Sequence, residues 1–222
     1  GGGFFGIREW QQLCQASFTP EEINEVTKFP WSTRTLNSQD PWDPSQSIAE
    51  THFAFLGIPT VRKRSGNRIK LDMVGFETLD FFHADNRDHK FSFDFKPDWV
   101  MRLPSTHSTC ALRWYLIRLG SAGSEGAYIW QEASLRDHPE YEVPSAVELV
   151  SARVLRLGGK TKDEDHRYVP FGVSYTSDEN PGHGRICVGN ISVQPGSLVI
   201  TTSKQSNHFT VGISPSRKIP VR

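Results

Sequence analysis

The sequence predicts a mainly β protein: an antiparallel β-sandwich of jelly-roll type, preceded by a short helical, Pro/Trp-rich N-terminal arm. Three observations lead to this class. About ten short apolar or alternating segments follow residue 50, turn-forming residues separate them, and helical periodicity is confined to the first thirty residues. We therefore expect an N-terminal helical segment and arm over residues 1–50 and a β-rich domain over residues 51–222.

Composition supports a folded chain. Of the 222 residues, 36% are hydrophobic and 23% are charged, which is more apolar surface than disordered chains carry. No stretch approaches the roughly 18 to 20 apolar residues that cross a bilayer, and no signal-peptide pattern opens the chain. We expect a soluble protein without a membrane span, in a reducing compartment or a virion.

Two short helices are expected in the N-terminal segment. Apolar residues at helical spacing predict the first over residues 7–14. The second begins at Pro20, because Thr19 is a suitable N-cap and Glu22 completes a capping box with it. This second helix ends immediately before Pro30, because a proline disfavours helical geometry in the residue that precedes it.

The following arm, residues 30–47, contains prolines and two tryptophans without any periodicity. Such a segment is expected to be extended and irregular. Trp31 and Trp42 have too few apolar neighbours in sequence to form a core of their own. We expect these rings either to pack onto the domain or to bind a partner chain, where tryptophan is a frequent anchor.

The rest of the chain is predicted to be strands. Phe91, Phe93 and Phe95 alternate with polar residues, which places their rings on one face of a sheet. Residues 110–119 are apolar on both faces except for two arginines, as expected of a central strand. The other predicted strands cover residues 53–57, 69–73, 127–131, 147–157, 168–176, 185–193, 198–202 and 209–214.

Two matching tripeptides are the sharpest motif of the sequence. His107-Ser-Thr109 and His208-Phe-Thr210 each precede alternating apolar residues. The pair resembles the signature of the two-histidine phosphoesterases, bilobal α+β enzymes in which both motifs open neighbouring strands. The resemblance implies that His107 and His208 act as general base and acid on an RNA 2′,3′-cyclic phosphate or similar diester, while Thr109 and Thr210 hold the phosphate.

This enzyme is kept as the alternative interpretation. The sequence lacks the helices that the lobes of the phosphoesterases require before and between the two motifs. About one residue in six is Ser or Thr, so His-x-Ser/Thr tripeptides also occur by chance. We therefore expect no catalytic activity and no cofactor.

Two acidic and histidine-rich segments could hold a cation. The first contains Asp80, His83, Asp85, Asp88 and His89, and the second spans residues 163–166. Neither has the spacing of an EF-hand or of a His-Glu-x-x-His zinc site, and basic residues are interspersed. We expect solvated loops and no metal.

The strongest basic patch flanks the turn at residues 65–67 and includes Arg62 and Arg64. A basic hairpin tip can bind phosphates, but it also serves as a charged edge that prevents strand aggregation. The chain has 25 basic and 25 acidic residues, so no overall positive field attracts it to a phosphate backbone. Nucleic acid is a possible partner that the sequence does not favour.

The three cysteines, Cys14, Cys110 and Cys187, are far apart and odd in number. This distribution predicts neither a disulfide framework nor a thiolate zinc site. We expect buried free thiols.

These observations predict a non-enzymatic recognition or assembly protein that binds a protein partner or further copies of itself. A viral coat-type structural subunit is one concrete form, because such subunits combine a jelly roll with an extended arm. A sugar-binding or scaffold module fits the same data, because folds of this kind support many functions. The ligand and the oligomeric state stay open at this stage.

Overall fold

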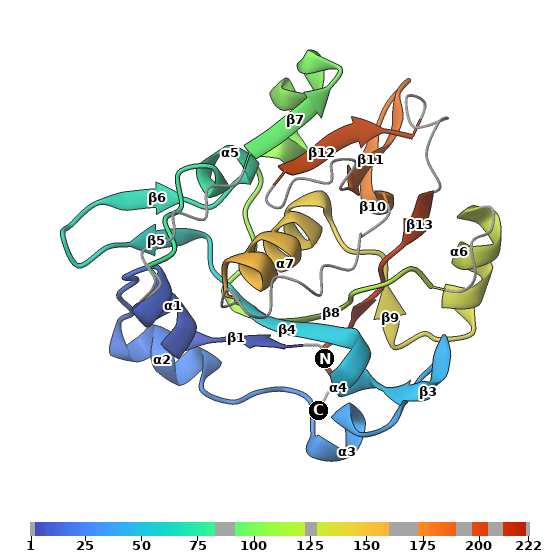
Figure 1. The fold of residues 1–222 in the computed structure, drawn as a ribbon, viewed down its shortest axis with the longest axis horizontal. Helices are drawn as coiled ribbons and strands as arrows, with labels where there is room; N and C mark the ends of the chain where they lie inside the picture. The colour runs from blue at the N-terminus through green and yellow to red at the C-terminus, as the bar shows by residue number, and fades with distance from the viewer. Residues whose placement is uncertain are drawn as a thin grey trace.

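The computed structural model of the chain describes residues 3–82, 92–122, 128–159, 173–189, 197–203 and 211–220. It is 31% helical and 35% strand. Two five-stranded sheets dominate, and two small two-stranded sheets accompany them. A central helix lies among them (Figure 1). The strand-rich class is confirmed, whereas the expectation that helix would be a small minority confined to the N-terminus is wrong.

The first sheet has the strand order β1-β4-β8-β14-β9. Strand β1 is parallel to β4, and the other pairs are antiparallel. The central position predicted for the apolar run is confirmed, because β8 lies between β4 and β14. The strands are β1 (Phe4–Phe5), β4 (His52–Gly57), β8 (Arg113–Arg118), β14 (Ser216–Arg217) and β9 (Tyr141–Glu142).

The second sheet has the order β13-β10-β11-β12-β7, with parallel pairs at its two edges and antiparallel pairs inside. Strand β7 confirms the alternation of Phe93 and Phe95, whose rings are half-buried while their polar neighbours are exposed. Phe91 lies outside the described residues. The strands are β13 (Val211–Ile213), β10 (Val173–Asn180), β11 (Gly184–Gly189), β12 (Ser197–Thr202) and β7 (Ser92–Lys96).

Helix α7 (Ala146–Gly158) replaces the strand predicted over residues 147–157. Ser145 caps it, with Glu148 completing a capping box, so its start is encoded locally. The helix contacts strands of both large sheets, and almost every residue in it is buried. The many apolar residues at positions 147–157 favoured a strand, although Glu148, Ser151, Arg153 and Arg156 interrupt them and the capping box favours a helix.

The strand predicted over residues 127–131 is also wrong. These residues begin helix α6 (Tyr128–Arg136). The apolar residues at its start continue into Gln-Glu-Ala-Ser-Leu-Arg, which are good helix formers apart from the serine. The apolar residues alone favour a strand, and the helix-forming residues that follow them favour the helix.

The expected strand 69–73 is interrupted. Strand β6 (Arg68–Lys70) pairs with β5 (Thr60–Arg62), and α5 (Met73–Phe76) then begins because the Asp72 side chain accepts a hydrogen bond from the amide of Gly75. The remaining short elements are β2 (Gln39–Asp40), β3 (Asp43–Ser47), α3 (Thr33–Leu36), α4 (Ile48–Thr51), η1 (Asp98–Arg102) and η2 (Pro104–His107).

Both N-terminal helices are confirmed, as α1 (Ile7–Leu13) and α2 (Pro20–Val26). The Thr19 and Glu22 capping box forms as predicted, although α2 ends before the last turn that was expected. These helices pack onto the first sheet: the indole nitrogen of Trp10 donates to the carbonyl of Leu56 in β4 at 2.8 Å. The N-terminal segment therefore adds β1 and large rings to the main core.

The described residues do not confirm a jelly-roll sandwich. In a sandwich the inner faces of two sheets pack directly on each other. Here α7 contacts β4 and β8 of the first sheet as well as β10 and β11 of the second, and its side chains share one core with theirs. Across the part of the chain that the structure describes, no helix has the length and apolar character needed to cross a bilayer.

Candidate functional site

The first of the two paired tripeptides does not open a strand. His107 ends the short helix η2, and its side chain is half exposed, with Nδ1 at 3.7 Å from Oδ2 of Asp72. Thr109 is half-buried in the connection to β8. The expectation that His107 begins a strand is wrong, because Pro104 starts a helical turn there instead.

His208 and Thr210 lie outside the described residues, so the convergence of the two imidazoles stays untested. The strands that follow the tripeptides are nevertheless informative. Strand β8 is antiparallel to β14, with Ile117 opposite Ser216, and Ala122 donates its amide to Ile213 at the end of β13. Strand β13 belongs to the second sheet and β8 to the first, so these two strands do not pair among the described residues, unlike the side-by-side arrangement that the resemblance implies.

The proposed cation ligands are mostly outside the described residues, namely His83, Asp85, Asp88, His89 and residues 163–166. Asp80 is described, and its carboxylate pairs with Lys63 at 3.4 Å. No group of three or more potential metal ligands occurs among the residues that the structure describes.

The basic patch is partly neutralised. Arg62 forms an ion pair and hydrogen bond with Glu22 of α2, and Lys63 pairs with Asp80. Arg64 is exposed in the turn between β5 and β6. The Arg62 side chain thus joins the β5–β6 hairpin to α2.

The cysteines are buried and free, as expected. Burial raises the pKa of the Cys110 thiol to about 12 and raises that of Cys14 as well. The Cys110 sulfur also lies 3.3 Å from the hydroxyl of Ser151 on α7. At neutral pH these two groups are thiols rather than nucleophilic thiolates.

The arm tryptophans are both engaged within the chain. Trp31 is 3% exposed, and its indole nitrogen donates to the carbonyl of Lys218 at 3.1 Å. Trp42 is half-buried, and its indole nitrogen donates to the hydroxyl of Ser134 on α6 at 2.7 Å. The Trp42 ring packs edge-on against Tyr141, with ring centres 4.8 Å apart.

Trp42 belongs to a group of aromatic and charged side chains that we call the Trp42 cluster. Within it, Arg118 donates to the fully buried carboxylate of Asp40 at 2.8 Å, and its guanidinium lies 5.8 Å from the Trp42 ring centre. Arg217 donates to the Tyr141 hydroxyl at 3.0 Å. The cluster comprises Asp40, Trp42, His52, Arg118, Tyr141 and Arg217.

His52 is the buried titratable base of this cluster. Its Nδ1 lies 2.8 Å from the hydroxyl of Thr51, which itself donates to the carbonyl of Ser47. With Thr51 donating to Ser47, the hydroxyl oxygen can accept from an Nδ1 proton, and Nε2 has no partner among the described residues. Burial is the main cause that lowers the pKa of His52 to about 3, so the ring is neutral.

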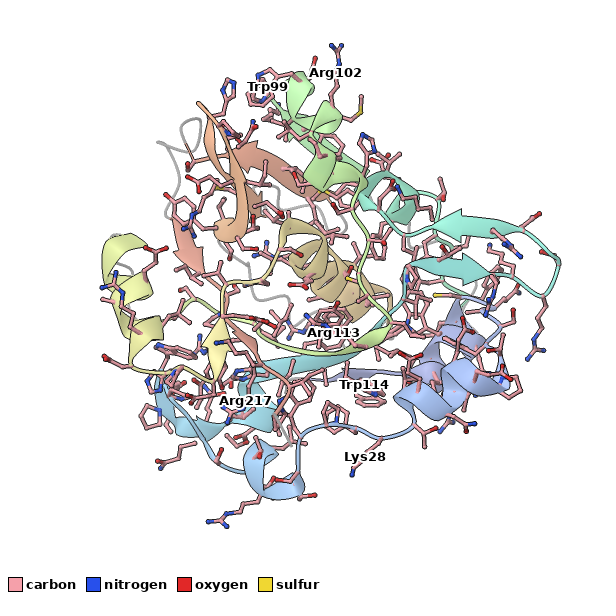
Figure 2. The ribbon with its side chains drawn as sticks, turned by 180° about the vertical axis from the view of Figure 1, so that it is seen from behind. Lys28, Trp99, Arg102, Arg113, Trp114 and Arg217 are labelled. Atoms are coloured by element: carbon pink, nitrogen blue, oxygen red, sulfur yellow. The ribbon has the colours of Figure 1, made fainter. Side chains whose placement is uncertain are left out.

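An open groove of about 460 Å³ lies beside this cluster, between α6 and β9. Leu135 and Tyr141 line it and share a small buried cluster with Ile213. Figure 2 shows Arg217 on this side of the molecule, far from Trp99 and Arg102 at the other end. The lining residues are Glu132, Leu135, Arg136, Pro139, Tyr141, Glu142, Val143 and Lys218.

The groove follows the edge of the first sheet. Strand β9 pairs with β14 on one side only among the described strands. The amide of Lys218 donates to the carbonyl of Glu140, and Ser216 lies opposite Glu142, so the backbone of these two glutamates faces β14. By alternation, the carbonyl of Tyr141 and the amide of Val143, which follows β9, face away from β14.

Of this site, the sequence indicated only Trp42. Arg118 is one of two charged residues in the otherwise apolar run of residues 110–119. A charged residue in a predicted central strand is the signal that could have identified Arg118 as part of the site. His52, Tyr141 and Arg217 carry no local signal, because they come from strands far apart in the sequence.

Comparisons of the chain with known protein families, with curated protein sequences and with solved structures find no match.

Proposed function

We propose that this chain is a non-enzymatic recognition protein that binds an extended segment of a partner protein in the groove between α6 and β9. The observation that carries the proposal is the coincidence of this groove with the outward-facing backbone of β9. An added strand gains main-chain hydrogen bonds from such an edge, while pockets beside it select side chains. A coat-type structural subunit is one form that this function could take.

The chemistry of the groove favours an apolar side chain at its centre. Leu135, Val143 and the ring of Tyr141 provide apolar contacts there, while Arg136 and Glu142 are exposed at the rim. Glu132 already pairs with Arg185 at 3.1 Å. We expect main-chain hydrogen bonds and one apolar contact to supply the affinity. The charges at the rim should determine which peptide sequences bind best.

The rigidity of the floor also supports binding. Tyr141 is held by Trp42, by the hydroxyl bond from Arg217 and by the ring of His52 at 5.6 Å. A preformed site loses less conformational freedom when it binds than a mobile one. Buried ion pairs such as Asp40 with Arg118 often contribute little net stability, and here the pair helps to fix the geometry of the site.

The test uses a phage-displayed library of random dodecapeptides, with enriched peptides synthesised and titrated by calorimetry. Val143→Pro removes the outward amide, and Val143→Ala keeps it, so the two variants separate main-chain binding from side-chain packing. We expect peptides that bind the natural protein to lose about tenfold or more in affinity with Val143→Pro and little with Val143→Ala. Equal binding to both variants, or no enrichment, would contradict the proposal.

A further inference from the structure

Among the described strands, β7 is an edge strand of the second sheet. Of these strands it pairs only with β12, to which it is parallel. Strand β7 lies at the rim of the molecule in Figure 1. It is well separated from the groove between α6 and β9, so this edge is independent of the function proposed above.

The outward backbone of β7 is available over a short window. The amide of Phe93 donates to a side-chain oxygen of Glu77 at 2.8 Å, which shows that it faces away from β12. By alternation, the amide and carbonyl of Phe95 face the same way. Pro97 has no amide proton, so Glu77 and Pro97 limit the open window to Phe95.

The side chains around this window have a symmetric arrangement of charge. Asp94 and Lys96 flank Phe95 on the exposed face of β7, and their side chains are 49% and 65% exposed. They pair with each other at 3.2 Å. Charges on an edge strand usually discourage pairing, but here opposite charges lie at equal distances before and after one residue.

We infer that β7 pairs antiparallel with β7 of a second copy of this chain, about a two-fold axis at Phe95. In that register Phe95 of each copy exchanges both backbone hydrogen bonds with Phe95 of the other. Asp94 of each copy lies opposite Lys96 of the other, so the two cross-strand pairs join opposite charges. The same patch serves both copies, as in most homodimers.

The contact is small. A single hydrogen-bonded pair, one pair of rings and two ion pairs fall well below the roughly 1,600 Å² of a standard interface. The dimer is therefore reversible, and its population depends on protein concentration and on salt.

The test measures the solution mass by sedimentation equilibrium at protein concentrations between roughly 5 and 500 µM. In this range the dimer population of a weak contact of this size is expected to rise with concentration. The natural chain is expected to rise from 25.1 kDa toward twice that mass. Asp94→Lys and Lys96→Asp each place like charges opposite one another and should weaken the dimer about tenfold or more. Circular dichroism and the unfolding midpoint confirm that these exposed changes leave the fold intact.

Two further samples test the proposed register of the pairing between the two β7 strands. The double variant Asp94→Lys/Lys96→Asp restores opposite charges and should dimerise like the natural chain. An equimolar mixture of the two single variants should form a heterodimer, because every facing pair is then of opposite sign. A natural chain that stays monomeric throughout, single variants that dimerise normally, or failure of both rescues would overturn the inference, and none of these results bears on peptide binding at β9.

Discussion

At the scale of single residues, tryptophan indoles join segments that are far apart in the sequence. Four of the six tryptophans donate their ring N–H across the fold: Trp10 to β4, Trp31 to the C-terminal segment, Trp42 to α6 and Trp114 to the end of α2. A buried indole needs such an acceptor, because an unpaired N–H in the core is costly. These rings therefore add specific connections as well as apolar area.

Trp114 tests this point. It is 7% exposed in the central strand β8, and its indole donates to the carbonyl of Val26 at 2.8 Å. Trp114→Ala should lower the free energy of unfolding by about 3 to 5 kcal/mol, as large aromatic deletions from cores do. Trp114→Phe keeps most of the apolar contact and should cost about 1 to 3 kcal/mol for the lost hydrogen bond. Urea unfolding measures both, and a midpoint that barely moves for the alanine variant would place this ring outside the core.

His52 makes stability depend on pH. Its pKa in the folded protein, about 3, is below the unfolded value near 6.5, so only the unfolded chain takes up a proton as the pH falls through 6.5. This contribution to stability is complete above pH 6.5 and is lost as the pH falls toward 3. Between pH 6.5 and 5 the loss should be about 2 kcal/mol.

The measurement is urea unfolding at several pH values for the natural chain and for His52→Gln. The variant should show a flatter profile over this window than the natural chain. Identical slopes for the two proteins would show that His52 takes up its proton as readily in the folded state as in the unfolded state.

The paired histidines yield a prediction about activity. An acid and a base that act on one diester must both lie within about 3 Å of its oxygens, directly or through one water. Because β8 and β13, the strands that follow the two tripeptides, belong to different sheets, we expect His107 and His208 not to converge. The natural protein should show no hydrolysis of 2′,3′-cyclic nucleotides above background. Turnover that disappears in folded His107→Ala or His208→Ala variants would instead establish the phosphoesterase.

At the scale of elements, α7 connects the two large sheets. Its side chains contact β4 and β8 on one side and β10 and β11 on the other. Cys110, which precedes β8, also contacts the hydroxyl of Ser151 in this helix. Loss of α7 would leave both sheets without their shared packing surface, so the position of its first turn matters for the whole fold.

The N-cap of α7 can be tested directly. The Ser145 hydroxyl accepts from the amide of Glu148, and the Glu148 carboxylate accepts from the amide of Ser145 at 2.9 Å. Ser145→Ala should lower the free energy of unfolding by about 1 kcal/mol, whereas Ser145→Asp keeps an acceptor and should cost much less. Thermal or urea unfolding distinguishes them. Equal losses in both variants would mean that the cap hydrogen bond is not the source of the effect.

At the scale of the whole molecule, segments near both ends of the chain contribute strands to the first sheet. Strand β1 forms one edge of this sheet, and β14, near the C-terminus, lies between β8 and β9 (Figure 1). Trp31 connects the arm to the carbonyl of Lys218. The N-terminal segment is therefore packed into the fold rather than attached as a tether.

Removing residues 1–47 tests this arrangement. The deletion takes β1 from the edge of β4 and removes Phe5, Trp10 and Trp31 from the main core. We expect the truncated protein to aggregate, or to bind a dye for exposed apolar surface, because a large patch of the first sheet becomes uncovered. A truncated chain with the mass, solubility and circular dichroism signal of an intact fold would show that the segment is dispensable.

The sequence by itself determined the features that depend on neighbouring residues. The Thr19 and Glu22 capping box, the alternation in β7 and the continuous apolar character of β4 and β8 follow from propensity and periodicity over a few positions. The capping box of α7 is also local, whereas the position of this helix between the two sheets, with even the Arg153 side chain buried, was decided by tertiary packing. The tertiary structure also decided the Trp42 cluster, since residues from Asp40 to Arg217 meet there only through strand order, which no local pattern encodes.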